Sequence, residues 1–270
     1  MLGNRMQPRT EPDVHDQQQV LTAVAEQLRQ AKALVVLTGA GVSAESGIPT
    51  FRDAMTGLWA RYDPMQLATS EAFARDPELV WKWYQWRREL VAAAQPNPAH
   101  RAIADMEGRL PSFTLVTQNV DRLHQRAGSR RVIELHGNLA ENRCSREQTV
   151  IPAEQTPPGS PPSCRSCGAP LRPNVVWFGE ALPADALEEA IDAAHRCDLL
   201  ICVGTSSLVY PAAALPVEAA MHGGQVVEIN PDTTPLTPAA THSLRGKAGE
   251  LLPRLVTLAF PAAAESGKST

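Results

Sequence analysis

Short apolar runs, rich in β-branched residues, alternate along this chain with stretches of helical spacing. The runs are Ala33–Thr38, Phe113–Thr117, Val132–Leu135, Leu199–Val203 and Val226–Ile229. Runs of this length and composition are typical of strands covered on both faces, as in a parallel sheet. The helical stretches include Gln17–Ala31, Glu78–Ala94, Asn97–Glu107 and Ala184–His195. The alternation predicts an α/β fold with a doubly wound parallel sheet, whose ligands bind at the carboxyl ends of the strands.

One segment, from Arg143 to Pro173, breaks this alternation. It shows little periodicity, contains seven prolines and carries three of the five cysteines. We therefore expect a small inserted lobe over residues 143–173, held together by something other than an apolar core. The main domain then comprises residues 17–142 and 174–260, with a disordered tail over residues 1–16 and a second tail over residues 261–270.

Charge and hydropathy weigh against several classes of partner. The net charge of −4 gives no bulk attraction to nucleic acid or to an anionic membrane surface. No apolar run approaches the roughly 20 residues that span a bilayer. The first residues lack the apolar core of a signal peptide. We expect a cytoplasmic protein with neither a nucleic-acid nor a membrane partner.

A glycine-rich turn follows the first run, from Gly39 to Arg52. Glycines at positions 39 and 41 would let a pyrophosphate approach backbone N–H groups closely. The next strand does not end in an obvious acidic residue that could bind a ribose, so this is not the ordinary dehydrogenase fingerprint. On spacing alone, the turn predicts either a nucleotide site or a plain tight turn.

The full turn, GAGVSAESGIPTFR, resembles the sirtuin signature GAGxSxxSGIPxFR. The resemblance continues in TQNVDRLH (117–124), ELHGN (134–138), VVWFGE (175–180) and GTSSLVYP (204–211), in the family's order. It implies a Rossmann-like domain in which NAD lies inverted relative to dehydrogenases. It also implies an enzyme that uses NAD to remove acyl groups from lysine side chains.

The resemblance assigns the cofactor contacts to the loops that follow the expected strands. Phosphate contacts, the loop that closes over NAD, the surroundings of nicotinamide and both riboses, and a main-chain contact to adenine are all represented. The implied NAD-binding residues are Gly39, Ala40, Gly41, Phe51, Arg52, Gln118, Asn119, Asp121, Gly204, Thr205, Ser206, Asn230 and Ala248.

His136 matches the catalytic histidine of the family. A neutral imidazole suits a general base that works near neutral pH. In the family's mechanism the acyl oxygen of the substrate expels nicotinamide from the ribose, and the base then removes a proton from the ribose hydroxyls. The implied products are free lysine, nicotinamide and O-acyl-ADP-ribose. Without the resemblance, a histidine at the end of a strand is equally well a structural one.

Two segments, Val176–Glu180 and Ser207–Tyr210, resemble those between which sirtuins bind the substrate peptide as an extra strand. Backbone pairing of this kind tolerates many peptide sequences. The implied partners are acylated-lysine proteins or peptides. The implied contacts are Val176, Phe178, Gly179, Glu180 and Val209.

Tyr84 and Arg87 are three residues apart on an expected helix and so share a face. Arginine offers a planar pair of donors to a carboxylate, and tyrosine adds a hydroxyl. The pair could also be an exposed arginine beside an aromatic stripe. However, this Y-x-x-R resembles the class III sirtuin motif, and Ala68 matches a small pocket residue of that class. The resemblance implies removal of succinyl, malonyl or glutaryl groups, with weaker action on acetyl groups.

Other activities remain as alternatives at this stage. A plain sirtuin-like deacetylase, an NAD hydrolase or a mono-ADP-ribosyltransferase would use the same cofactor site. The Tyr84/Arg87 pair and the peptide-binding segments disfavour the last two. A silent NAD-sensing module is disfavoured because Asn119, Asp121 and His136 occur together.

The cysteines of the expected lobe depart from the family pattern. Sirtuins usually bind zinc there through two C-x-x-C pairs, but here Cys164 and Cys167 form the only pair, and the first reads Cys144-Ser-Arg-Glu147. Three thiolates and one carboxylate can form a tetrahedral zinc site. A metal-free lobe stiffened by its prolines is equally conceivable.

Overall fold

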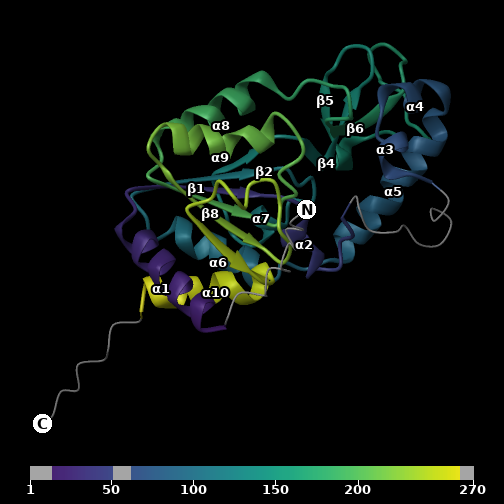
Figure 1. Cartoon of the computed structure of the whole chain (residues 1–270). Coiled ribbons are helices and arrows are strands. Elements are labelled where there is room, and N and C mark those ends of the chain that lie inside the picture. The colour runs from purple at the N-terminus through teal and green to yellow at the C-terminus, as the bar shows by residue number, and fades with distance from the viewer. Residues whose placement is uncertain (1–13, 51–61, 262–270) are drawn as a thin grey trace, which may run out of the picture.

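A parallel sheet forms the centre of the computed structural model, which describes residues 14–50 and 62–261 (Figure 1). Its strands are β1 (Ala33–Thr38), β2 (Ser112–Thr117), β3 (Val132–Glu134), β7 (Leu199–Val203), β8 (Gln225–Asn230) and β9 (His242–Arg245). They lie in the order β3-β2-β1-β7-β8-β9, and all neighbours are parallel. The predicted doubly wound sheet is confirmed, and its order reverses between β1 and β7, where such sheets open a crevice for ligands.

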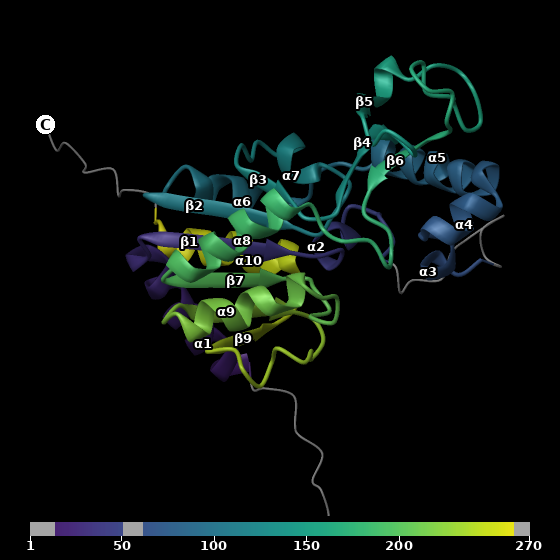
Figure 2. The same ribbon diagram turned by 90° about the horizontal axis from the view of Figure 1, so that it is seen from above.

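Helices cover both faces of this sheet, which explains why its central strands are apolar throughout (Figures 1 and 2). On one face lie α1 (Val14–Gln30), α6 (Pro98–Glu107) and α10 (Ala248–Ala259); on the other lie α8 (Ala184–Arg196) and α9 (Leu215–Met221). Alternate residues of β1 serve the two layers, with Leu34 and Val36 on the first side and Val35 and Leu37 on the second.

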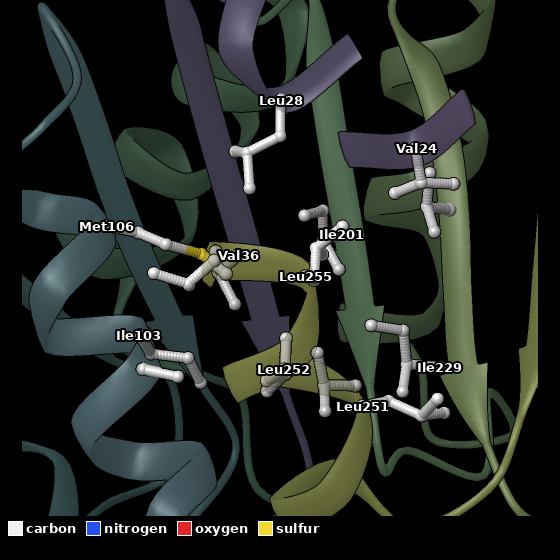
Figure 3. Close-up of a cluster of buried hydrophobic side chains, with 14 of the residues drawn as sticks. Val24, Leu28, Val36, Ile103, Met106, Ile201, Ile229, Leu251, Leu252 and Leu255 are labelled. Carbon is white, nitrogen blue, oxygen red and sulfur yellow. The ribbon is translucent and has the colours of Figure 1, made fainter. Parts of the chain in front are cut away.

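The larger core layer is shown in Figure 3, where Val36 and Ile201 from the sheet meet Met106 of α6 and Leu255 of α10. All four side chains are fully buried. Truncating a buried leucine of this kind to alanine typically costs about 2–5 kcal/mol of stability.

The helices begin where the sequence supplies caps. Asp76 accepts a hydrogen bond from the Leu79 amide at 2.9 Å at the start of α5 (Pro77–Ala93). Asn97 forms a capping box with His100 at the start of α6. Both helices carry proline in the first turn, where its missing N–H costs nothing.

A second, antiparallel sheet lies beyond the carboxyl ends of the parallel strands (Figure 2). Its strands, in the order β5-β4-β6, are β4 (Gly137–Cys144), β5 (Val150–Pro152) and β6 (Leu171–Val175). The short helices α3 (Pro64–Leu67) and α4 (Ser70–Arg75) lie beside it with α5. The remaining short elements are α2 (Gly41–Ala44), α7 (Leu123–Arg126), η2 (Ala153–Gln155) and η3 (Ala212–Ala214).

Three boundaries differ by more than one residue from the sequence-based expectation. Helix α1 begins at Val14 rather than at Gln17. The sheet of the small lobe extends past residues 143–173 on both sides, since β4 begins at Gly137 and β6 ends at Val175.

In residues 14–50 and 62–261, no helix is both long and apolar enough to cross a bilayer.

Candidate active site

The loops after β1 and β7 meet at the point where the strand order reverses. The Gly41 amide donates to the Gly204 carbonyl at 2.8 Å, and a Cβ on Gly41 would lie only 2.7 Å from that oxygen. Gly204 has φ +59, and a Cβ there would lie 2.5 Å from the Val42 nitrogen. A side chain at either position would therefore push the two loops apart.

Loops from two further strands are tied to this crevice through Thr205. The Gln118 side-chain amide, after β2, donates to the Thr205 hydroxyl at 3.2 Å. The Asn230 side-chain amide, at the end of β8, donates to the Thr205 carbonyl at 2.7 Å. Ser206 follows directly and is half-buried, and Ala248 begins α10 just after β9. The predicted cofactor residues of four loops therefore lie at one edge of the sheet.

A buried polar cluster lies beneath the β1 loop. Asn119 donates to the Ser43 hydroxyl at 3.1 Å, and that hydroxyl donates to the Asp121 carboxylate at 2.7 Å. Burial raises the pKa of Asp121, although hydrogen bonds from the Leu123 amide and Ser43 oppose the shift. Ser43 therefore fixes two predicted cofactor residues. Ser43 was not among the predicted site residues, although it is the serine of the glycine-rich signature, two residues after Gly41.

His136 lies in the two-residue turn between β3 and β4, and its imidazole is oriented by a backbone carbonyl. Its Nδ1 lies 3.0 Å from the Gln118 carbonyl oxygen, which can only accept, so Nδ1 carries the proton and Nε2 keeps a lone pair. Burial lowers the pKa of His136, and the bond to Gln118 offsets this only in part. The imidazole is therefore neutral near pH 7 and can act as a base at Nε2.

The backbone of His136 also contacts the expected peptide-binding region. The Val176 amide donates to the His136 carbonyl at 2.9 Å, and the Phe178 amide donates to the Ala68 carbonyl at 2.9 Å. Phe178 and Val209 expose 38% and 39% of their surface, which leaves apolar side chains at both predicted peptide segments. These bonds place the predicted peptide segment next to both the base and the predicted acyl pocket.

Gly179 and Glu180 complete the turn after Phe178. Gly179 has φ +86, which glycine adopts without strain. The Glu180 carboxylate accepts from the Trp177 amide at 2.9 Å and forms an ion pair with Arg172. The Glu180 side chain thus holds its own segment, and the Glu180 amide closes the turn by donating to the Trp177 carbonyl at 3.0 Å.

Tyr84, Arg87 and Ala68 come together in the buried cluster between α5 and the small sheet. Tyr84 is only 1% exposed, and its hydroxyl accepts a hydrogen bond from the Trp177 indole at 2.9 Å. The Arg87 guanidinium lies 5.7 Å from the centre of the Tyr84 ring and 5.2 Å from that of Trp83.

Burial dominates the titration of this pair. It raises the pKa of Tyr84 to about 12, and the nearby Arg87 charge offsets only part of that shift. Burial likewise lowers the pKa of Arg87 from its usual value. Ala68 belongs to the same cluster and is 3% exposed. The arrangement is an apolar, largely buried cluster with the Arg87 guanidinium against Trp83 and Tyr84, and with Arg172 against the Trp177 ring.

Four potential zinc ligands meet in the small lobe. The donor atoms of Cys144, Glu147, Cys164 and Cys167 all lie within 4.8 Å of one another. The two sulfurs of Cys144 and Cys167 are 3.4 Å apart, and the Glu147 amide lies 3.3 Å from the Cys144 sulfur. Ser166 donates to the Glu147 carboxylate at 3.1 Å and orients it. Three thiolates and a carboxylate fit the donor set of a structural zinc ion.

Two predicted cofactor residues, Phe51 and Arg52, lie outside the described residues. The other two cysteines, Cys197 and Cys202, are buried in the layer of α8 and α9.

The chain is similar in sequence to a known family and to named members of it. A family model described as "Sir2 family" matches residues 39–211. A protein of Pseudomonas aeruginosa named "NAD-dependent protein deacylase 1" is 55% identical over 89% of this chain and 100% of its own length. One of the same name from Archaeoglobus fulgidus is 56% identical over 85% of this chain and 94% of its own.

Solved structures agree. The crystal structure of a Sir2 homolog–NAD complex has a TM-score of 0.81 and 55% identity, and the match covers 87% of this chain and 91% of that one. A Sir2–p53 peptide–NAD⁺ complex has a TM-score of 0.77 and 38% identity, with 85% and 94% of the two chains covered.

Proposed function

This chain belongs to the Sir2 family and is an NAD-dependent protein deacylase, and we propose that it prefers acidic acyl groups such as succinyl, malonyl and glutaryl over acetyl. The observation that carries the preference is the position of Arg87 beside Tyr84, at the edge of an apolar cluster. A carboxylate that enters an apolar pocket must give up its water, and a fixed cation and a donor offset that cost.

The residues at the crevice fit NAD. We assign its phosphates to the glycine loops at Gly41 and Gly204, where close packing admits no side chain. We assign nicotinamide and its ribose to Gln118, Asn119 and Asp121, of which the last two are held by Ser43. When bound, NAD supplies a ribose carbon whose bond to nicotinamide can be broken.

The protein's own part in the chemistry centres on His136. Its Nδ1–H donates to the Gln118 carbonyl, which leaves Nε2 to accept a proton from a ribose hydroxyl. The hydrogen bond from the Val176 amide to the His136 carbonyl holds this base next to the segment to which we assign the peptide. The acyl-lysine would thus extend from that segment toward Ala68, Tyr84 and Arg87.

We further propose that Cys144, Glu147, Cys164 and Cys167 hold one structural zinc ion. The cluster lies in a separate small core with Leu171, whereas the proposed base is His136. The zinc would therefore stabilise the lobe without taking part in the reaction.

Product analysis on a panel of acylated peptides tests the proposed activity. Equal amounts of succinyl, malonyl, glutaryl and acetyl peptide of one sequence are incubated with NAD, and kcat/KM is measured for each. We expect kcat/KM at least about tenfold higher for the acidic groups, with O-acyl-ADP-ribose as the product. Equal values across the panel would leave a plain deacetylase. Free ADP-ribose without loss of the acyl group would indicate an NAD hydrolase.

A further inference from the structure

A second cluster of metal-binding side chains lies at the opposite edge of the sheet from the crevice. Helix α8 ends at Arg196 and leads into the start of β7, and α9 ends at Met221 and leads into the start of β8. His195 lies in the last turn of α8, Glu218 lies within α9, and His222 caps the C-terminus of α9. The cluster therefore sits at the amino ends of the strands, away from the proposed NAD and acyl sites.

The three side chains face one another closely. The rings of His195 and His222 are stacked with centres 3.8 Å apart and an angle of 23° between their planes. The His195 Nε2 lies 3.0 Å from a Glu218 carboxylate oxygen. One donor atom from each residue lies within 4.8 Å of the other two.

The free nitrogen of His222 is fixed by the backbone. Its Nδ1 lies 2.9 Å from the Glu218 carbonyl oxygen, which can only accept, so the proton is on Nδ1 and the lone pair on Nε2. Metal-binding histidines are commonly oriented in this way, by a carbonyl on the nitrogen that does not bind the metal.

The two helices that carry the cluster form a rigid support. Glu218 lies on α9 and His222 caps its C-terminus, where the His222 amide donates to the Glu218 carbonyl at 3.2 Å. Ala190 and Ala194 of α8 pack in the same buried layer as Ala219 of α9. Ligands on packed helices hold a metal geometry better than ligands on loops.

We propose that His195, Glu218 and His222 bind a transition-metal ion that links α8 to α9. Two imidazole nitrogens and one carboxylate favour Zn²⁺, Co²⁺, Ni²⁺ or Cu²⁺ over Mg²⁺ and Ca²⁺, which prefer oxygen donors alone. The ion replaces the proton that His195 and Glu218 share, and that proton leaves to solvent. Because the His195 and Glu218 side chains are 33% and 38% exposed, water completes the coordination.

The donor atoms lie close together, but one imidazole has to rotate out of the stack, because a metal ion lies in the plane of each ring that binds it and the two planes are only 23° apart. Zinc bonds of about 2.0–2.2 Å at tetrahedral angles separate the donor atoms by roughly 3.3–3.5 Å. The 3.0 Å separation of His195 and Glu218 has to open by a few tenths of an ångström, and the donor of His222 has to approach. Glu218 and His195 are already partly solvent-exposed, so these rotations disturb no packed core.

The test is metal binding to the tag-free full chain, with the probe ions chosen to separate this site from the cysteine lobe. Zn²⁺ titration by calorimetry should show one binding event of micromolar affinity beyond any zinc that the lobe retains. Co²⁺ in this event should give only weak ligand-field bands, because thiolates, which add strong charge-transfer absorption, are absent from the set. Mg²⁺ in excess should not compete.

Substitutions locate the event on the surface cluster. His195→Gln and His222→Gln should each weaken it by about tenfold or more, since even the loss of a supporting contact commonly costs 10–100-fold in metal affinity. His242→Gln, the same change on β9, should leave it intact. Saturating Zn²⁺ should raise the melting temperature of the wild type by a few degrees and leave His222→Gln unchanged.

Two results would overturn the proposal. One is a wild-type chain that binds no Zn²⁺ or Co²⁺ outside the cysteine lobe. The other is an unchanged binding event in both His195→Gln and His222→Gln, with melting of each variant in chelator showing that it is folded. Neither result bears on the deacylase, because these residues lie at the far edge of the sheet from His136.

Discussion

The crevice between β1 and β7, to which we assign NAD, and the cluster beside Arg87, to which we assign the acyl group, are built from different materials. The crevice consists of glycine backbone and short polar side chains joined by hydrogen bonds, as in the chain from Asn119 through Ser43 to Asp121. The proposed acyl site is an apolar cluster of aromatic and aliphatic side chains that α5 shares with β4 and β6, with the Arg87 guanidinium against Trp83 and Tyr84. A change in the crevice should therefore affect every acyl substrate alike, whereas a change in the pocket should discriminate between them.

The largest effect should come from the base and be shared by all substrates. His136→Ala removes the proton acceptor and should lower kcat by about 10²–10⁴-fold on succinyl and acetyl peptides alike. NAD affinity should stay within a few-fold, because the base acts after the cofactor binds. Single-turnover rates and NAD titration measure the two quantities. A variant with near wild-type turnover would remove His136 from the mechanism.

The small lobe supports the pocket more than the crevice, since Leu139 of β4 and Val175 of β6 belong to the cluster with Tyr84. If zinc is bound, Cys164→Ser should lower the melting temperature by about 5 °C or more, in line with a loss of roughly 2 kcal/mol. The KM for the peptide should rise more than the KM for NAD.

Elemental analysis and thermal melting check this prediction, with Cys197→Ser in the α8–α9 layer as the control for loss of a buried thiol. Wild-type protein purified without added metal should contain about one zinc per chain. Wild-type protein that contains no zinc as purified, is fully active and keeps the same melting temperature after Cys164→Ser would show that the lobe works without zinc.

A smaller effect concerns the pH dependence of the crevice. Burial lowers the pKa of His136, and a base must be neutral to accept a proton. Activity is therefore full above this pKa and falls as the pH drops through it, so the acid limb should lie below about 6.5, the ordinary histidine value. The profile of kcat should be the same for succinyl and acetyl peptides. An acid limb well above 6.5 would contradict the buried, neutral imidazole.

How well the sequence predicted each strand depends on whether helices cover both of its faces. The strands β1 and β7 are apolar on both faces because helices cover both, and their runs were predicted with few errors. Strand β9 was missed because it lies at the sheet edge and reads His242-Ser-Leu-Arg245, with only Leu244 buried. Strand β4 was missed for a similar reason, since Gly137–Cys144 is largely polar.

The candidate site rests on resemblance to a family motif more than on the spacing of its residues. Helical spacing placed Tyr84 and Arg87 on one face but did not indicate that the Tyr84 hydroxyl is occupied by the Trp177 indole, 93 residues away. The spacing in the C-x-x-C pair likewise did not show that Glu147 would stand with three sulfurs; the fold of β4 and its turn brings it there. Long-range contacts of this kind depend on tertiary packing, which local patterns do not contain.

The central claim is that Arg87 selects acidic acyl groups, and the selectivity ratio of Arg87→Met tests it most directly. The change keeps much of the side-chain volume and removes the charge. We predict that kcat/KM for a succinyl peptide falls by about 10²-fold or more, as for an uncompensated buried charge, while kcat/KM for the acetyl peptide is unchanged or slightly higher. Arg88→Met is the matched control, because the adjacent arginine donates to the Leu139 carbonyl at 2.8 Å and supports the fold. Equal losses on both peptides in Arg87→Met, as expected for Arg88→Met, would contradict the acidic-acyl preference.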